Sequence, residues 1–176
     1  MKATIEWMTE NYNLLNETLF RGYLPPCLFS IEKTNKVNTL GTFSLKAKRL
    51  KIKTATRRIF TESYLGDTIY INKSNFYERC YPTIWLNNNY DTDEEALLNT
   101  LVHEMCHYYT YCDGFCPRQG HGPEFREIAA AVSYRSGKRF SIERLATAEE
   151  MDMRTLDSNL QDRMDRRKAN RKTNAN

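Results

Sequence analysis

Two of the three histidines in this sequence form an H-E-x-x-H motif, and the third follows shortly after it. The motif occupies residues 103–107 (HEMCH), and His121 lies in the stretch GHGPEF of residues 120–125. On a helix, residues four apart are separated by about 40° around the axis and about 6 Å along it. The rings of His103 and His107 can therefore converge on one ion. This grouping predicts a metal site.

Zinc suits this set of ligands. Zn²⁺ binds imidazole nitrogen at about 2.0–2.1 Å, and a catalytic zinc site has three protein ligands and one position open for water. His103 and His107 supply two ligands, and His121, on a turn flanked by glycines, is the candidate for the third. Glu104 is then free to take a proton from water and to deliver it to the leaving amine. We therefore predict a zinc-dependent peptidase with Glu104 as its catalytic residue.

Other interpretations of these residues stay open. H-E-x-x-H is short and also occurs on helices whose histidines bind no metal. Glu124 could be the third ligand, although a carboxylate there also suits the start of a helix or a hydrogen bond to a ligand histidine. The metzincin pattern fails, because the Gly and His that it requires after the second His are missing. Cys106, Cys112 and Cys116 lack paired C-x-x-C spacing, and we expect Cys106 to be a buried apolar residue.

A helix should carry the motif. Thr92 can be its N-cap, with Glu95 completing a capping box. Apolar residues at helical spacing continue it to about Cys112, with Gly114 beyond its end. A second helix is predicted from Pro123 to near Gly137.

An N-terminal helix and several short strands precede the motif. Ile5, Met8, Tyr12, Leu15 and Leu19 recur at helical spacing. Strands are predicted at residues 28–32, 39–45, 50–53, 68–72 and 83–87, with a loop at 73–82 and a last strand at 139–142. We expect an α+β fold in which a small antiparallel sheet lies between the N-terminal helix and the motif helix.

Length and composition limit the remaining possibilities. A chain of 176 residues suits one domain with a substantial core. No apolar run is long enough to span a membrane, and residues 1–7 lack the apolar region of a signal peptide. Five cysteines at irregular spacing do not suggest a disulfide framework. We expect reduced thiols, no membrane partner and a cytoplasmic, nucleoid-associated location.

Basic charge is unevenly distributed. Residues 33–61 hold nine Lys or Arg and no acid, so they carry +9 while the rest of the chain carries −5. This asymmetry suggests a polyanionic partner; a solvated basic strand is the alternative. DNA, single-stranded or duplex, is the polyanion that we expect. Residues 163–172 are also basic, and we expect residues 146–176 to be a charged helix that becomes a partly disordered tail. The candidate contacts for DNA are Lys46, Lys48, Arg49, Lys51, Lys53, Arg57 and Arg58.

These motifs together resemble the SprT-like metalloprotease family, which includes the Spartan DNA-dependent proteases. The resemblance rests on residues 101–109 (LVHEMCHYY) and 120–125, and more weakly on 14–25, 40–43 and 83–87. It implies zinc on His103, His107 and His121, catalysis by Glu104, and a zincin-like minimal protease domain over residues 1–145. The resemblance also implies the activity of the best-known members, which is cleavage of proteins bound or crosslinked to DNA.

The chain departs from the family at two places. Several members carry a four-cysteine zinc ribbon after the protease domain, but no cysteine follows Cys116 here, and residues 60–80 look like an insertion. We predict a zinc-dependent endopeptidase acting on protein substrates, including DNA-associated or DNA-crosslinked proteins. The alternative is a non-catalytic, zinc-containing DNA-binding module that uses residues 46–58.

Overall fold

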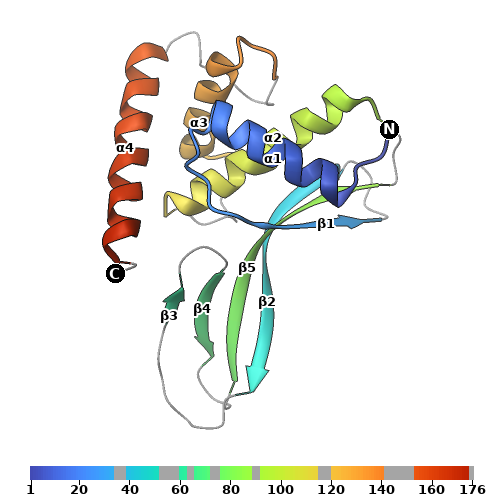
Figure 1. Cartoon of the computed structure of the whole chain (residues 1–176), viewed down its shortest axis with the longest axis vertical. Helices are drawn as coiled ribbons and strands as arrows, with labels where there is room; N and C mark the ends of the chain where they lie inside the picture. The colour runs from blue at the N-terminus through green and yellow to red at the C-terminus, as the bar shows by residue number, and fades with distance from the viewer. Residues whose placement is uncertain are drawn as a thin grey trace.

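The computed structural model describes residues 1–33, 39–51, 60–62, 66–71, 76–88, 92–114, 120–140 and 153–174, and these form an α+β fold. Figure 1 shows the helices gathered at one end and the strands running away from them. The elements in chain order are α1 (Ile5–Leu19), β1 (Leu28–Glu32), β2 (Gly41–Lys51), β3 (Phe60–Glu62), β4 (Gly66–Ile71), β5 (Phe76–Asn87), α2 (Glu94–Cys112), α3 (Pro123–Arg135) and α4 (Met153–Asn174).

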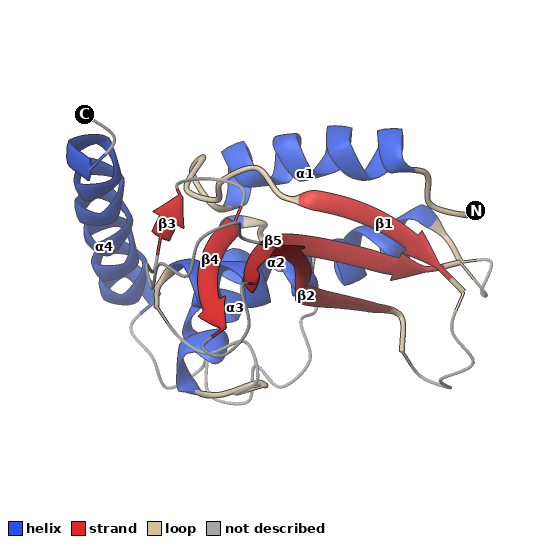
Figure 2. Ribbon diagram, turned by 90° about the horizontal axis from the view of Figure 1, so that it is seen from below, coloured by secondary structure: helices blue, strands red, loops and turns tan. Residues whose placement is uncertain are grey.

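The five described strands form one mixed sheet, with β5 paired to three of the others (Figure 2). β2 and β4 pair antiparallel with β5, and β3 pairs antiparallel with β4. β1 pairs parallel with β5, which corrects the expectation of an antiparallel sheet. The reason is topological: each strand from β2 to β5 runs opposite to the strand before it in the chain, so β5 has the same direction as β1.

The long pair of β2 and β5 also departs from the prediction. β2 is one strand of 11 residues where the sequence predicts two segments, and Lys53, in the second of them, lies outside the described residues. β5 begins at Phe76, so the loop predicted at 73–82 is wrong from that residue onward. Short alternating patterns do not show whether neighbouring segments join, because the pairing partner decides how far a strand continues. Arg139 and Phe140 are not in a strand, and residues 141–142 are outside the described part.

The helices pack around a core that includes the inner half of the sheet. α1 contacts β1, α2 contacts both β2 and β5, and α3 packs on α2. The apolar residues predicted for one face of α1 are buried, except for Ile5, which is 40% exposed. Thr4 is the N-cap of this helix. None of the described helices has the length and apolar composition needed to cross a bilayer.

A buried asparagine holds the turn after α1. The Asn16 side chain donates to the Leu24 carbonyl over 2.9 Å and accepts from the Leu24 amide over 3.1 Å. Between them the chain passes through the left-handed region, with φ of 55° at Arg21 and 62° at Gly22. Glycine suits the second position because residues with a Cβ rarely adopt this positive φ.

The described residues 153–174 of the basic C-terminal segment form one helix, α4, which ends at Asn174. Leu160 and Met164 are buried against the rest of the core. Arg163 and Arg167 contact Asp113 at the end of α2, at 3.9 Å and 2.6 Å. Composition alone suggested weak helix formation, but buried contacts and ion pairs hold α4 in place. The predicted domain boundary near residue 145 lies outside the described residues.

Candidate metal centre

The motif lies in the middle of α2, so neighbouring helical turns support it on both sides. Asp93, not the expected Thr92, is the N-cap, and its carboxylate accepts from the Ala96 amide over 2.7 Å. Glu95 forms an ion pair with Arg139 at 2.8 Å. The predicted capping box is therefore wrong in its residues, although the helix itself and its end at Cys112 are confirmed.

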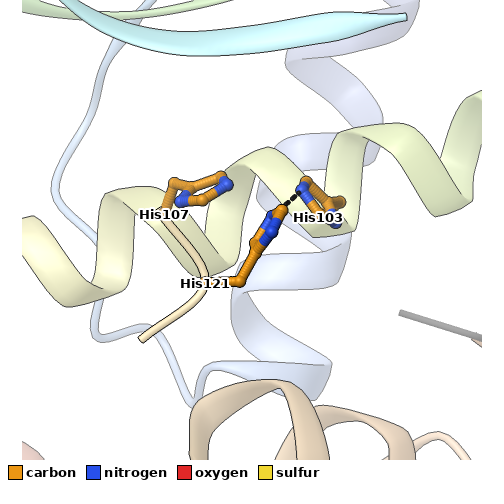
Figure 3. Close-up of side chains that lie close together, drawn as sticks. All are labelled: His103, His107 and His121. Atoms are coloured by element: carbon orange, nitrogen blue, oxygen red, sulfur yellow. Dashed lines mark hydrogen bonds between the residues drawn. The ribbon is translucent and has the colours of Figure 1, made fainter. Parts of the chain in front are cut away.

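The structure brings the three predicted histidines together. Figure 3 shows the rings of His103 and His107, on α2, turned toward the ring of His121. His121 Nε2 lies 3.0 Å from His103 Nε2, and one ligand nitrogen from each residue lies within 4.8 Å of the others.

This arrangement fits a metal ion. In a tetrahedral zinc site the ligand nitrogens lie about 3.3–3.4 Å apart, close to the spacing of His103 and His121. Among the described residues these three histidines are the group that could hold an ion, and Glu124 is not part of it.

His121 reaches the helix from the short segment before α3. Gly120 has a φ of 63°, which reverses the chain at little steric cost, and Pro123 occupies the start of α3. The Arg126 Nε donates to the His121 carbonyl over 3.2 Å. The loop backbone is thus tied to the first turn of α3, which places the His121 ring opposite His103.

The Phe125 ring contacts the imidazoles of all three histidines. Its ring centroid lies 4.4 Å from that of His107, 4.6 Å from His121 and 5.1 Å from His103, and the side chain is buried. The sequence predicts Phe125 only as a core residue of α3. Its place two residues after Pro123 in the GHGPEF stretch is the signal that could have linked it to the site.

The His107 imidazole is suited to bind a cation rather than a proton. Burial, together with the neighbouring His103 and His121, lowers the pKa of His107 to about 3. At neutral pH the ring of His107 is therefore uncharged, as a metal ligand must be.

Glu104 lies on α2 next to the ligands but faces the sheet. It is 6% exposed, and its Oε2 accepts a hydrogen bond of 2.7 Å from the backbone amide of Phe43 on β2. Burial raises its pKa to about 7, while the Phe43 amide opposes that rise. A carboxyl group with this pKa can both accept and release a proton near neutral pH.

The remaining candidates near the motif are mostly core residues. Cys106, Tyr108 and Tyr109 are at most 2% exposed, as the packing interpretation expects. Cys27, Cys106 and Cys112 are free thiols. Cys116 lies outside the described residues.

Four of the seven predicted DNA contacts are in the described part of the chain, on β2. Lys46, Lys48, Arg49 and Lys51 lie on the outer half of β2, which extends away from the helices (Figure 1). Their backbones pair with residues 76–81 of β5. Lys53, Arg57 and Arg58 fall outside the described residues.

Comparison with known proteins identifies one family. The model of the SprT-like family matches residues 8–146, which include most of α1, every element from β1 to α3 and all three histidines, and the match ends before α4. No curated protein matches the chain, and no solved structure does.

Proposed function

The chain belongs to the SprT-like family, and on that premise we propose that it is a zinc-dependent endopeptidase that hydrolyses peptide bonds in protein substrates. One observation carries the proposal: three imidazoles converge beside a buried carboxyl group that is not among them. A three-histidine site with an adjacent, separate carboxylate is typical of catalytic rather than structural zinc.

Each residue has a distinct role in the proposed reaction. His103, His107 and His121 would hold the ion, and the packing of Phe125 would fix the orientation of their rings. Bound zinc would polarise the peptide carbonyl and make water more acidic. Glu104 would take the proton of the attacking water on its Oε1, since Oε2 is engaged by Phe43. Glu104 would then deliver that proton to the amine that leaves.

Metal analysis combined with a cleavage assay tests this proposal. The purified protein should contain about one zinc ion per chain and cleave an unfolded protein substrate. Glu104→Gln should keep the zinc and abolish cleavage, because an amide cannot accept the proton. The matched control is Glu94→Gln, an exposed acid in the first turn of the same helix. Cleavage by Glu104→Gln at the wild-type rate would remove Glu104 from the mechanism.

DNA-associated or DNA-crosslinked proteins are the proposed substrates. Support comes from the family and from the excess of basic residues between positions 33 and 61. The test is binding to single-stranded and duplex DNA at several salt concentrations, together with cleavage in the presence and absence of each. Binding that weakens steeply with salt would support phosphate contacts. No binding at low salt would discard the DNA part and leave the peptidase proposal intact.

A non-catalytic DNA-binding module with structural zinc is the alternative. A structural site usually has four protein ligands, whereas the group found in the described residues has three. Stoichiometric zinc and DNA binding without any Glu104-dependent cleavage would favour this alternative.

A further inference from the structure

One hydrogen bond joins the sheet directly to the carboxyl group of the motif. The Phe43 amide on β2 donates to Glu104 Oε2 over 2.7 Å, between residues 61 positions apart in the chain. Phe43 and Glu104 are 7% and 6% exposed. The contact is therefore a buried one that depends on how β2 lies on α2.

The ladder of the sheet leaves the Phe43 amide available for this contact. In an antiparallel pair, residues alternate between facing the partner strand and pointing away from it. The Leu40 carbonyl accepts from the Asn87 amide, so Leu40 faces β5 and so does Thr42, two residues on. The Phe43 amide points to the opposite edge, where it meets Glu104. The hydrogen bond from Phe43 to Glu104 therefore does not replace any hydrogen bond between β2 and β5.

Side chains on one face of α2 contact Phe43, near the start of β2. Phe43 stacks on Tyr108 with ring centroids 5.1 Å apart and an interplanar angle of 25°, and it contacts Tyr111 at 5.8 Å. Glu104 and Tyr108 are four residues apart, and Tyr111 is three further, so these side chains share one helix face. The aromatic contacts hold the Phe43 backbone beside the carboxyl group.

A glycine at the first residue of β2 favours the close approach of the strand to α2. A Cβ on Gly41 would lie 3.0 Å from Leu86 Cδ2, 3.1 Å from Thr100 Cγ2 and 3.1 Å from the Trp85 carbonyl oxygen. Thr100 is one turn before Glu104 on α2. The absence of a side chain at position 41 thus lets β2 lie near enough to α2 for the hydrogen bond to form.

We propose that the backbone amide of Phe43 is a positioning group that fixes the orientation of Glu104, with Gly41 permitting the close approach. It holds one carboxylate oxygen and directs the other toward the proton that Glu104 transfers. This proposal rests on the proposed function, because it assigns Phe43 a role in the reaction of the same site.

Replacing the backbone amide by an ester tests the proposal. Incorporating 3-phenyllactic acid at position 43 removes the N–H and keeps the aromatic ring, so the packing on Tyr108 is retained. We expect kcat to fall on the order of 100-fold, as misplacement of a catalytic group can cause. KM and the zinc bound per chain should stay at wild-type values. A purely structural role would instead lower zinc content and thermal stability.

The matched control is an ester at Leu45. Its amide points in the same direction from β2 but lies two residues farther along the strand. We expect this variant to keep the wild-type kcat. Equal losses of kcat at positions 43 and 45, or an unchanged kcat for the ester at 43, would overturn the proposal.

A measurement that does not depend on cleavage activity distinguishes failure of this proposal from failure of the proposed function. In NMR spectra of the zinc-loaded protein, the Phe43 amide proton should move upfield in Glu104→Ala, because its acceptor is removed. The Asn87 amide, which donates to the Leu40 carbonyl, serves as the internal reference. Equal small shifts of both amides would refute the hydrogen bond and the proposal, even for an active enzyme. An inactive wild-type protein with the expected Phe43 shift would refute the proposed peptidase function instead.

Discussion

Asp157→Asn should destabilise the protein, because Asp157 joins α4 to α3 and to the turn after α1. Its carboxylate pairs with Arg135 of α3 at 2.5 Å and with Arg21, after α1, at 2.7 Å. The Arg135 side chain is 6% exposed, and burial lowers the pKa of its guanidinium, an effect that Asp157 opposes. The substitution therefore leaves a buried cation without its carboxylate.

The expected size of the effect follows from the burial of the pair. Removal of one partner from a buried ion pair costs roughly 3–5 kcal/mol. The lower end applies, because Asp157 is 15% exposed and Arg135 keeps a 2.6 Å hydrogen bond to the Leu19 carbonyl. Loss of the contact to Arg21, which is 40% exposed, adds at most about 1 kcal/mol. A loss of about 3 kcal/mol lowers Tm by about 6–12 °C in a domain of this size.

Urea unfolding measures this change, with zinc content held equal in all samples because bound metal shifts apparent stability. The matched control is Asp162→Asn, an exposed acid on the same helix, which should change stability by less than about 0.5 kcal/mol. The double variant Arg135→Met with Asp157→Leu should recover part of the loss, because it removes the unpaired charge. A change in Asp157→Asn no larger than in the control would refute the view that this ion pair holds α4 in place.

Three further predictions concern the metal centre and its support. His121→Ala should weaken zinc binding by at least about 100-fold, as competition with a chelator would measure. Glu124→Gln should leave zinc binding unchanged. The reverse result would make Glu124 the third ligand. In metal-free protein, the stability of wild type relative to Glu104→Gln should rise by about 3 kcal/mol as the pH falls from 8 to 4. The cause is that folding raises the pKa of Glu104 from 4.5 to about 7, so the folded state binds the extra proton. Urea unfolding at both pH values measures this change, and a parallel pH dependence of the two proteins would contradict it. Gly41→Ala should lower stability by about 1–3 kcal/mol through overpacking against the Trp85 carbonyl and Thr100, as thermal unfolding would show; wild-type stability would mean that β2 can move away without cost.

The sequence alone determined the parts of the site that depend on near neighbours. Four-residue spacing placed His103 and His107 on one helix face, and the apolar pattern around them predicted α2 almost to its last residue. The glycines around His121 and the proline after it predicted a turn followed by a helix, as the structure shows. Local backbone preferences and side-chain spacing carry this information, so it can be read without knowledge of the fold.

The sequence was less informative where two solutions are locally equivalent. Thr92 and Asp93 are both good N-cap residues, and the structure uses Asp93. The basic residues of α4 look like a solvated tail until Asp113 and Glu127 are found opposite Arg163. Their contribution depends on partners that are distant in the chain.

Only the tertiary structure decided how the carboxyl group of the motif is held. Strand register sets which amide of β2 faces α2, and the packing of Gly41 on Thr100 sets how closely the strand approaches. The same packing brings the Phe43 amide to Glu104 across 61 residues of chain. Short alternating patterns do not encode register or distance between layers, because both follow from the packing of the whole core. The motif thus identifies the residues of the candidate site, and the fold determines how the carboxyl group of Glu104 is held.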